Sequence, residues 1–178
     1  MWNTPPELIV RVRAAIGDID LDPASNLLAQ TLIGAADWYG PEQNDPDKRD
    51  GLVREWSGGT VFINPPFGRS GNKPVAGIWF EKAEAELEAG RIERFAFLTH
   101  SRYGYPWFAD RVRLYWTVTT DRCPHFLNVE GKRESGSKTA ATFFFAGDFD
   151  PGAVRQAFES VGRLTPPDRV LKKYYPAI

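Results

Sequence analysis

The sequence has little cysteine, little histidine and almost no excess of charge. Cys123 is the one cysteine, which excludes an intramolecular disulfide and a zinc site built from several cysteines. The two histidines, His100 and His125, stand too far apart in sequence to suggest a metal pair, so we expect no metal site. The formal net charge is -1, which is less basic than most proteins that bind nucleic acid nonspecifically.

Long apolar runs are missing too. No stretch is long and apolar enough to span a bilayer, and no charged-then-apolar leader opens the chain. We therefore expect no membrane association and a reducing, cytoplasmic setting. The length of 178 residues suits one compact core, and an aromatic content of 13% argues against disorder. We expect residues 1–164 to form one domain and the Pro-rich, basic residues 165–178 to form a peripheral tail.

Helix-like and strand-like segments alternate along the chain, which predicts an α/β fold with helices on both faces of a mostly parallel sheet. Thr4 is the expected N-cap of the first helix, with Pro5 at its first position, Glu7 completing a capping box and Gly17 ending it. Further helices are predicted at 76–89, 105–112 and 151–161. Strands are predicted at 19–22, 60–63, 95–99, 114–119 and 139–146, with a possible short strand at 32–35 and an exposed, mobile segment at 68–73.

The strongest functional signal is a buried strand that runs directly into Asn64-Pro65-Pro66-Phe67. Two prolines fix the backbone and remove two N–H donors, which leaves carbonyl oxygens and one amide side chain beyond the strand end. Ligands bind at this edge of α/β sheets. The plain alternative is a turn that only terminates the strand.

The chemistry of an exocyclic purine amine suits such a loop. Its lone pair is delocalised into the ring, so two acceptors on its two N–H bonds can turn the lone pair out of the plane toward a methyl donor. The Asn64 side-chain oxygen and the Pro65 carbonyl are candidates for these acceptors, and Phe67 for stacking on the base. Stacking of this kind contributes about 1–3 kcal/mol per base, and the target base has to leave the helix to be reached.

From Trp2 to about Ala146 the chain resembles the small phage- and prophage-type DNA N-6-adenine methyltransferases. The loop Asn64-Pro65-Pro66-Phe67 is similar to that family's Asn/Asp-Pro-Pro-aromatic motif. The resemblance implies a Rossmann-like methyltransferase fold with an antiparallel C-terminal strand. It also implies S-adenosylmethionine as cofactor, DNA as substrate, and a bacterial or phage-infected host cytoplasm.

Other blocks follow in the family's order. The Trp2-Asn3-Thr4-Pro5 opening implies that Thr4 approaches the cofactor's carboxylate. The resemblance further assigns to the cofactor site the strand end Asp22-Pro23, Asp50 and the loop residue Asn64. Two features depart from the usual pattern. Pro23-Ala24-Ser25-Asn26 stands where methyltransferases usually have Gly-x-Gly, and Asp37 is the only candidate for holding the ribose.

Residues 121–138 form a long connection between two strands and are the candidate target-recognition loop. Its Lys132, Arg133 and Lys138, together with Arg102 after the strand at 95–99, are the candidate DNA contacts. Three alternatives remain open: an RNA adenine as substrate, a protein glutamine amide as substrate, and a non-catalytic nucleic-acid-binding module. The oligomeric state and the target sequence do not follow from the sequence.

Overall fold

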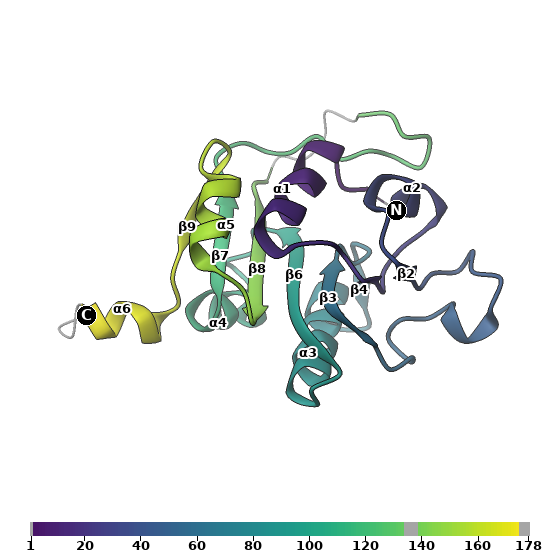
Figure 1. Cartoon of the computed structure of the whole chain (residues 1–178), viewed down its shortest axis with the longest axis horizontal. Coiled ribbons are helices and arrows are strands. Elements are labelled where there is room, and N and C mark those ends of the chain that lie inside the picture. The colour runs from purple at the N-terminus through teal and green to yellow at the C-terminus, as the bar shows by residue number, and fades with distance from the viewer. Residues whose placement is uncertain (1, 134–138, 175–178) are drawn as a thin grey trace.

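The computed structural model describes residues 2–133 and 139–174 and is an α/β structure (Figure 1). Its central sheet has seven strands in the order β2-β1-β3-β6-β8-β7-β9. The strands are β1 (Leu21–Asp22), β2 (Asp37–Trp38), β3 (Gly58–Ile63), β6 (Ile92–His100), β7 (Trp116–Thr120), β8 (Ala141–Gly147) and β9 (Gly162–Thr165). A separate two-stranded hairpin pairs β4 (Arg69–Ser70) with β5 (Lys73–Pro74).

The sheet is mostly parallel, as predicted. Strands β2, β1, β3 and β6 pair in parallel, whereas β8 lies antiparallel between β6 and β7, and β9 is antiparallel to β7. Strand β8 is buried over nearly its whole length. Phe143 and Phe145 face one side of the sheet and Phe144 the other, which is the alternation that the pleat imposes.

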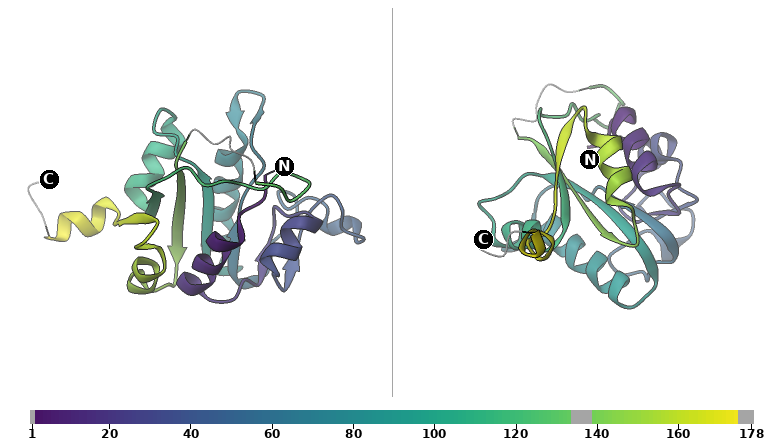
Figure 2. Two further views of the ribbon diagram at one scale, coloured as in Figure 1. Left: turned by 90° about the horizontal axis from the view of Figure 1, so that it is seen from above. Right: turned by 60° about the vertical axis from the view of Figure 1, so that its left-hand side comes forward.

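Helices cover both faces of this sheet (Figure 2). The first hydrophobic core lies under α1 (Pro6–Ile16), α2 (Leu27–Ile33) and α5 (Pro151–Phe158). The second core lies under α3 (Val75–Glu88) and α4 (Pro106–Leu114). A short 3-10 turn, η1 (Pro46–Lys48), lies in the loop before β3, and α6 (Asp168–Tyr174) extends away from the body at the C-terminal end (Figure 1).

Several predicted boundaries are confirmed. Helix α1 buries Leu8, Val12 and Ala15 and ends at Gly17, whose φ of 89° favours glycine. Helix α5 begins after Asp150, whose carboxylate accepts from the backbone N–H groups of Gly152 and Ala153. Both elements therefore follow from local capping chemistry together with an apolar stripe.

Other predictions are wrong. Thr4 is not a cap: α1 begins after Pro5 without a side-chain cap, and the Thr4 hydroxyl accepts from Asn64 instead. The segment near Leu32 is the end of helix α2, which Asn26 caps, and not a strand. Gly162 does not end a helix but opens β9, so the sheet reaches Thr165, one residue into the predicted tail.

Candidate functional site

The carboxyl ends of β1, β3 and β6 meet at one edge of the sheet. From β1 the chain crosses to β2 on one side, and β3 lies on the other side of β1, so the strand order reverses between β1 and β3. Asp22 ends β1 and Asn64 follows β3, which puts both at this switch point. In open α/β sheets the crevice at such a point is the usual ligand site.

Asn64 is 9% exposed and its orientation is fixed. Its Nδ2 donates to the Trp2 carbonyl at 3.1 Å and to the Thr4 hydroxyl at 3.0 Å. Because a backbone carbonyl can only accept, the Trp2 contact defines which end of the amide is nitrogen. The Asn64 Oδ1 is buried and has no hydrogen-bond partner within residues 2–133 and 139–174. A buried acceptor without a partner destabilises a protein by about 1–3 kcal/mol, so this oxygen is ready for an incoming N–H donor.

Asp22 is the acidic neighbour of Asn64. It is 2% exposed, and burial raises the pKa of its carboxyl to about 7 although hydrogen bonds from the Ser25 side chain and the Ala24 N–H act in the opposite direction. Thr4, Asp22 and Asn64 line one small cavity of about 10 Å³. The structure thus brings together three of the residues predicted for the cofactor site, from three separate segments of the chain.

The backbone of Pro23 closely approaches the backbone of Gly51, the residue after Asp50. A Cβ atom at Gly51 would stand 2.1 Å from the Pro23 carbonyl oxygen, so only glycine permits this approach. Asp50 itself is exposed and accepts from the Leu52 N–H at 2.9 Å. It lines an open depression of about 830 Å³ that also includes Trp56, and it is not part of the wall around Asn64.

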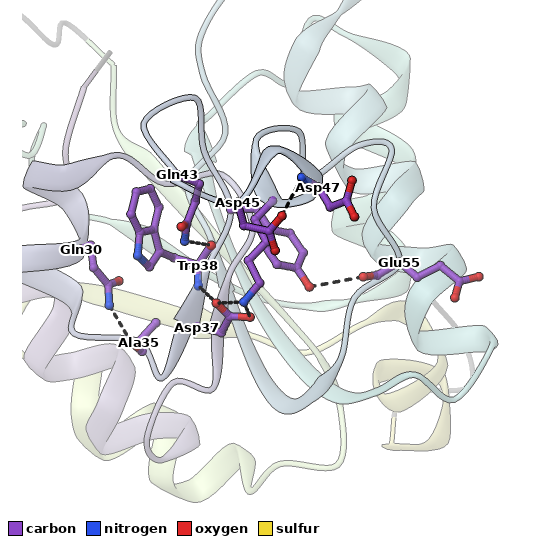
Figure 3. A network of polar contacts seen from close by, with 10 residues as sticks. Gln30, Ala35, Asp37, Trp38, Gln43, Asp45, Asp47 and Glu55 are labelled. Atoms are coloured by element: carbon purple, nitrogen blue, oxygen red, sulfur yellow. Dashed lines mark hydrogen bonds and ion pairs between the residues drawn. The ribbon is translucent and has the colours of Figure 1, made fainter.

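Asp37 is engaged elsewhere. Its carboxylate holds the Lys48 ammonium at 2.7 Å and accepts from the Trp38 N–H at 2.8 Å (Figure 3). The Gln43 side chain donates to the Trp38 carbonyl in the same network (Figure 3). These contacts hold β2 against the loop that precedes β3, which accounts for Asp37 without a ligand.

Phe67, which follows the Pro65-Pro66 segment, does not line the cavity around Asn64. Its ring meets the His100 ring edge-on, with 4.4 Å between centroids, and the Phe126 ring at 6.0 Å. It borders a pocket of about 190 Å³ whose wall includes His100, Tyr105 and Trp107. Burial and the nearby Arg102 charge lower the pKa of His100, so its ring is neutral at neutral pH.

The predicted nucleic-acid contacts separate into two groups. Arg102 is exposed at the rim of the pocket beside Phe67. Lys132 instead forms an ion pair with Glu130 at 2.9 Å, and Arg133 pairs with Glu7 at 3.0 Å, so each of these two predicted contacts already has an acidic partner in the protein. Lys138 lies outside the described residues.

Asn3 and Asn26, for which the sequence predicted no role, contribute contacts at this edge of the sheet. Asn3 exchanges backbone hydrogen bonds with Leu127, and its side chain links Asn26 to the Asn128 carbonyl. The N-terminal segment 2–4 is thereby fixed between the loop at 121–133 and Asn64. A pairing across more than 120 residues leaves no local signal, although Asn26 directly before an apolar run could have been read as a helix cap.

Comparisons of the chain with protein-family models, curated proteins and solved structures gave no match. Within residues 2–133 and 139–174, no group of three His, Cys, Asp or Glu side chains is arranged to hold a metal ion. The helices of that part of the chain are all too short or too polar to cross a membrane.

Proposed function

We propose that this protein is an S-adenosylmethionine-dependent methyltransferase that acts on the N6 amine of adenine in DNA. The observation that carries the proposal is the buried Asn64 Oδ1 at the switch point of the sheet, which has no hydrogen-bond partner among the described residues. An amide whose nitrogen is fully used and whose oxygen is free is built to accept from an N–H group. A neutral acceptor of this kind binds an amine without removing its proton.

The proposed reaction needs little else from the protein. Asn64 Oδ1 and the Pro65 carbonyl would accept from the two N–H bonds of the amine and turn its lone pair out of the ring plane. S-adenosylmethionine supplies, when bound, an electrophilic methyl group on a cationic sulfur. The amine nitrogen becomes acidic only as it forms the new C–N bond, so its proton can pass to solvent and no strong base is required.

The residues around Asn64 fit this cofactor chemically. The Asp22 carboxylate matches the ammonium of its methionine portion, and Thr4 is the neighbouring hydroxyl. The cavity of about 10 Å³ has room for about one water molecule. Binding therefore requires its walls, which include the N-terminal segment and α2, to move apart.

The sheet agrees with the same proposal. A mostly parallel sheet with the reversed strand β8 inserted between β6 and β7 is what a Rossmann-like methyltransferase fold with an antiparallel C-terminal strand implies, and β9 adds a second reversed strand at the edge. Fold alone does not define the reaction. It does explain why Asp22, Asn64 and His100 share one edge.

Among the alternatives, a flat base is favoured over a protein glutamine side chain. The pocket beside Phe67 is walled by aromatic rings, including His100 and Trp107, and such walls suit the π-face of a nucleobase. An RNA adenine presents the same amine and the same face. The choice between DNA and RNA therefore rests on the family resemblance.

Radiolabelled methyl transfer to DNA, RNA and protein in parallel, with nucleoside analysis of the product, tests the proposal. We expect N6-methyladenine in DNA. Asn64→Ala should lower the rate by about 100-fold or more, a loss typical of removing one oriented polar group from an active site, while cofactor affinity measured by calorimetry is largely kept.

The exposed Asn44 offers the matched control, because Asn44→Ala removes the same side chain at a residue that does not line the cavity around Asn64. Thermal unfolding of both variants shows whether Asn64→Ala is folded. Transfer by folded Asn64→Ala at the wild-type rate would disprove the mechanism. Label in protein or RNA alone would disprove the proposed substrate.

A further inference from the structure

Aromatic side chains come from the Phe67 loop and from the segment that leads into α4. They are Phe67, Tyr105 and Trp107, which line one pocket, and Tyr103, which packs on Phe108 as Trp107 does, and we call these four rings the aromatic platform. Tyr103 is 61% exposed and Tyr105 is 37% exposed, so both rings are accessible to a ligand. Tyr103 packs edge-on against the fully buried Phe108, with 5.1 Å between centroids, so its ring is held in place although it faces solvent.

Two arginines flank this platform. Arg69 comes from the β4–β5 hairpin and Arg102 from the turn before α4, and both line the pocket of about 190 Å³. The hairpin and α4 lie on the same side of the sheet (Figure 2). Neither arginine forms an ion pair with an acidic side chain among the described residues. This differs from Lys132 and Arg133, whose charges are paired.

We propose that the aromatic platform, with Arg69 and Arg102, binds an unpaired nucleic-acid strand next to the target adenine, so that the enzyme's preferred substrate is single-stranded. This rests on the proposed function for the position of the target. Exposed rings bordered by cations are how proteins hold single strands, because every unpaired base offers a face for stacking and every nucleotide a phosphate.

The charge of the molecule favours the same substrate. A base inside a duplex is stacked on both sides, so Tyr103 and Tyr105 could reach its face only after unstacking, which costs a few kcal/mol. Duplex-binding proteins offset such costs with many phosphate contacts. Here the net charge is -1, and Lys132 and Arg133 already pair with acidic side chains, so fewer cations are available for such contacts.

Fluorescence anisotropy with labelled oligothymidylate of about twelve nucleotides, a length within the range that such surfaces cover, tests the inference. This probe contains no adenine, so Asn64 plays no part in its binding. We expect it to bind at least about tenfold more tightly than the thymidylate–adenylate duplex of the same length. Tyr103→Ala should weaken single-strand binding by about fivefold or more, whereas Tyr103→Phe, which keeps the ring, should bind as wild type does.

The salt dependence of single-strand binding tests whether Arg102 contacts a phosphate. Arg102→Gln should reduce the slope of log affinity against log salt by about 0.7, the value for one phosphate contact on a single strand. Arg163→Gln is the matched control, because Arg163 is exposed on the edge strand β9, far along the sheet from β6. Its slope should equal that of the wild type.

Equal or tighter binding of the duplex would overturn the inference, and so would unchanged single-strand binding by folded Tyr103→Ala. The proposed function fails by a different measurement, the absence of methyl transfer. Tight single-strand binding by Asn64→Ala would support the platform whether or not that variant transfers methyl groups.

Discussion

Raising the pH should destabilise this protein through Asp22. Burial raises the pKa of its carboxyl from 3.8 to about 7, so the unfolded chain gives up the proton at a lower pH than the folded protein does. Between these values the unfolded state binds fewer protons, and the free energy of unfolding falls as pH rises. The contribution of the protonated Asp22 carboxyl to the free energy of unfolding is fully present below the ordinary pKa of 3.8 and is lost by about pH 7. A difference of about three pKa units corresponds to about 4 kcal/mol.

Urea denaturation of the wild type and of Asp22→Asn, from about pH 4 to about pH 8, measures this contribution. Asparagine cannot ionise, so the variant should gain stability relative to the wild type by up to about 4 kcal/mol across this window. Asp148→Asn, at an exposed aspartate, is the matched control. A difference between Asp22→Asn and wild type that does not change with pH would refute the reasoning.

The ionisation of Asp22 should also control the affinity for the proposed cofactor. A cationic ligand beside Asp22 binds the ionised form, so its affinity should rise about tenfold per pH unit below about pH 7 and level off above it. Calorimetry with S-adenosylmethionine should show this slope for the wild type and no slope for Asp22→Asn. Equal affinity of the two proteins at every pH would remove Asp22 from the cofactor site.

Two further predictions concern the stability of the fold. Glu86 is fully buried, pairs with Lys82 and Arg91 and accepts from the Trp56 N–H. Glu86→Ala should therefore lower the free energy of unfolding, measured by urea denaturation, by about 3–5 kcal/mol. A loss below about 1 kcal/mol would contradict this prediction. Gly51→Ala should destabilise by about 1–3 kcal/mol because its Cβ would overlap the Pro23 carbonyl, whereas Gly104→Ala, with open space around it, should leave the melting temperature nearly unchanged.

Local chemistry made much of the fold predictable. Asp150-Pro151 began a helix as expected, and the apolar runs of β3 and β8 are buried strands. The misreading near Leu32 shows the limit, because a short apolar run fits a strand as well as a helix and only the cap at Asn26 separates the two. Thr4 was misjudged for another reason. The sequence around Thr4 fits a capping box, but its hydroxyl accepts a hydrogen bond from Asn64, which is 60 residues away in the sequence.

The contact between Thr4 and Asn64 shows why the position of Asn64 could be predicted from the sequence while its hydrogen bonding could not. The loop motif placed Asn64 correctly, since it depends on the strand and two prolines. What makes Asn64 useful is that its Nδ2 is used by Trp2 and Thr4 and its Oδ1 is not, and this asymmetry exists only in the folded chain. The segment that creates it is itself fixed by the Asn3–Leu127 pairing. Hydrogen bonds therefore connect the loop at 121–133 through residues 2–4 to the side chain of Asn64, and the orientation of that side chain depends on contacts far apart in the sequence.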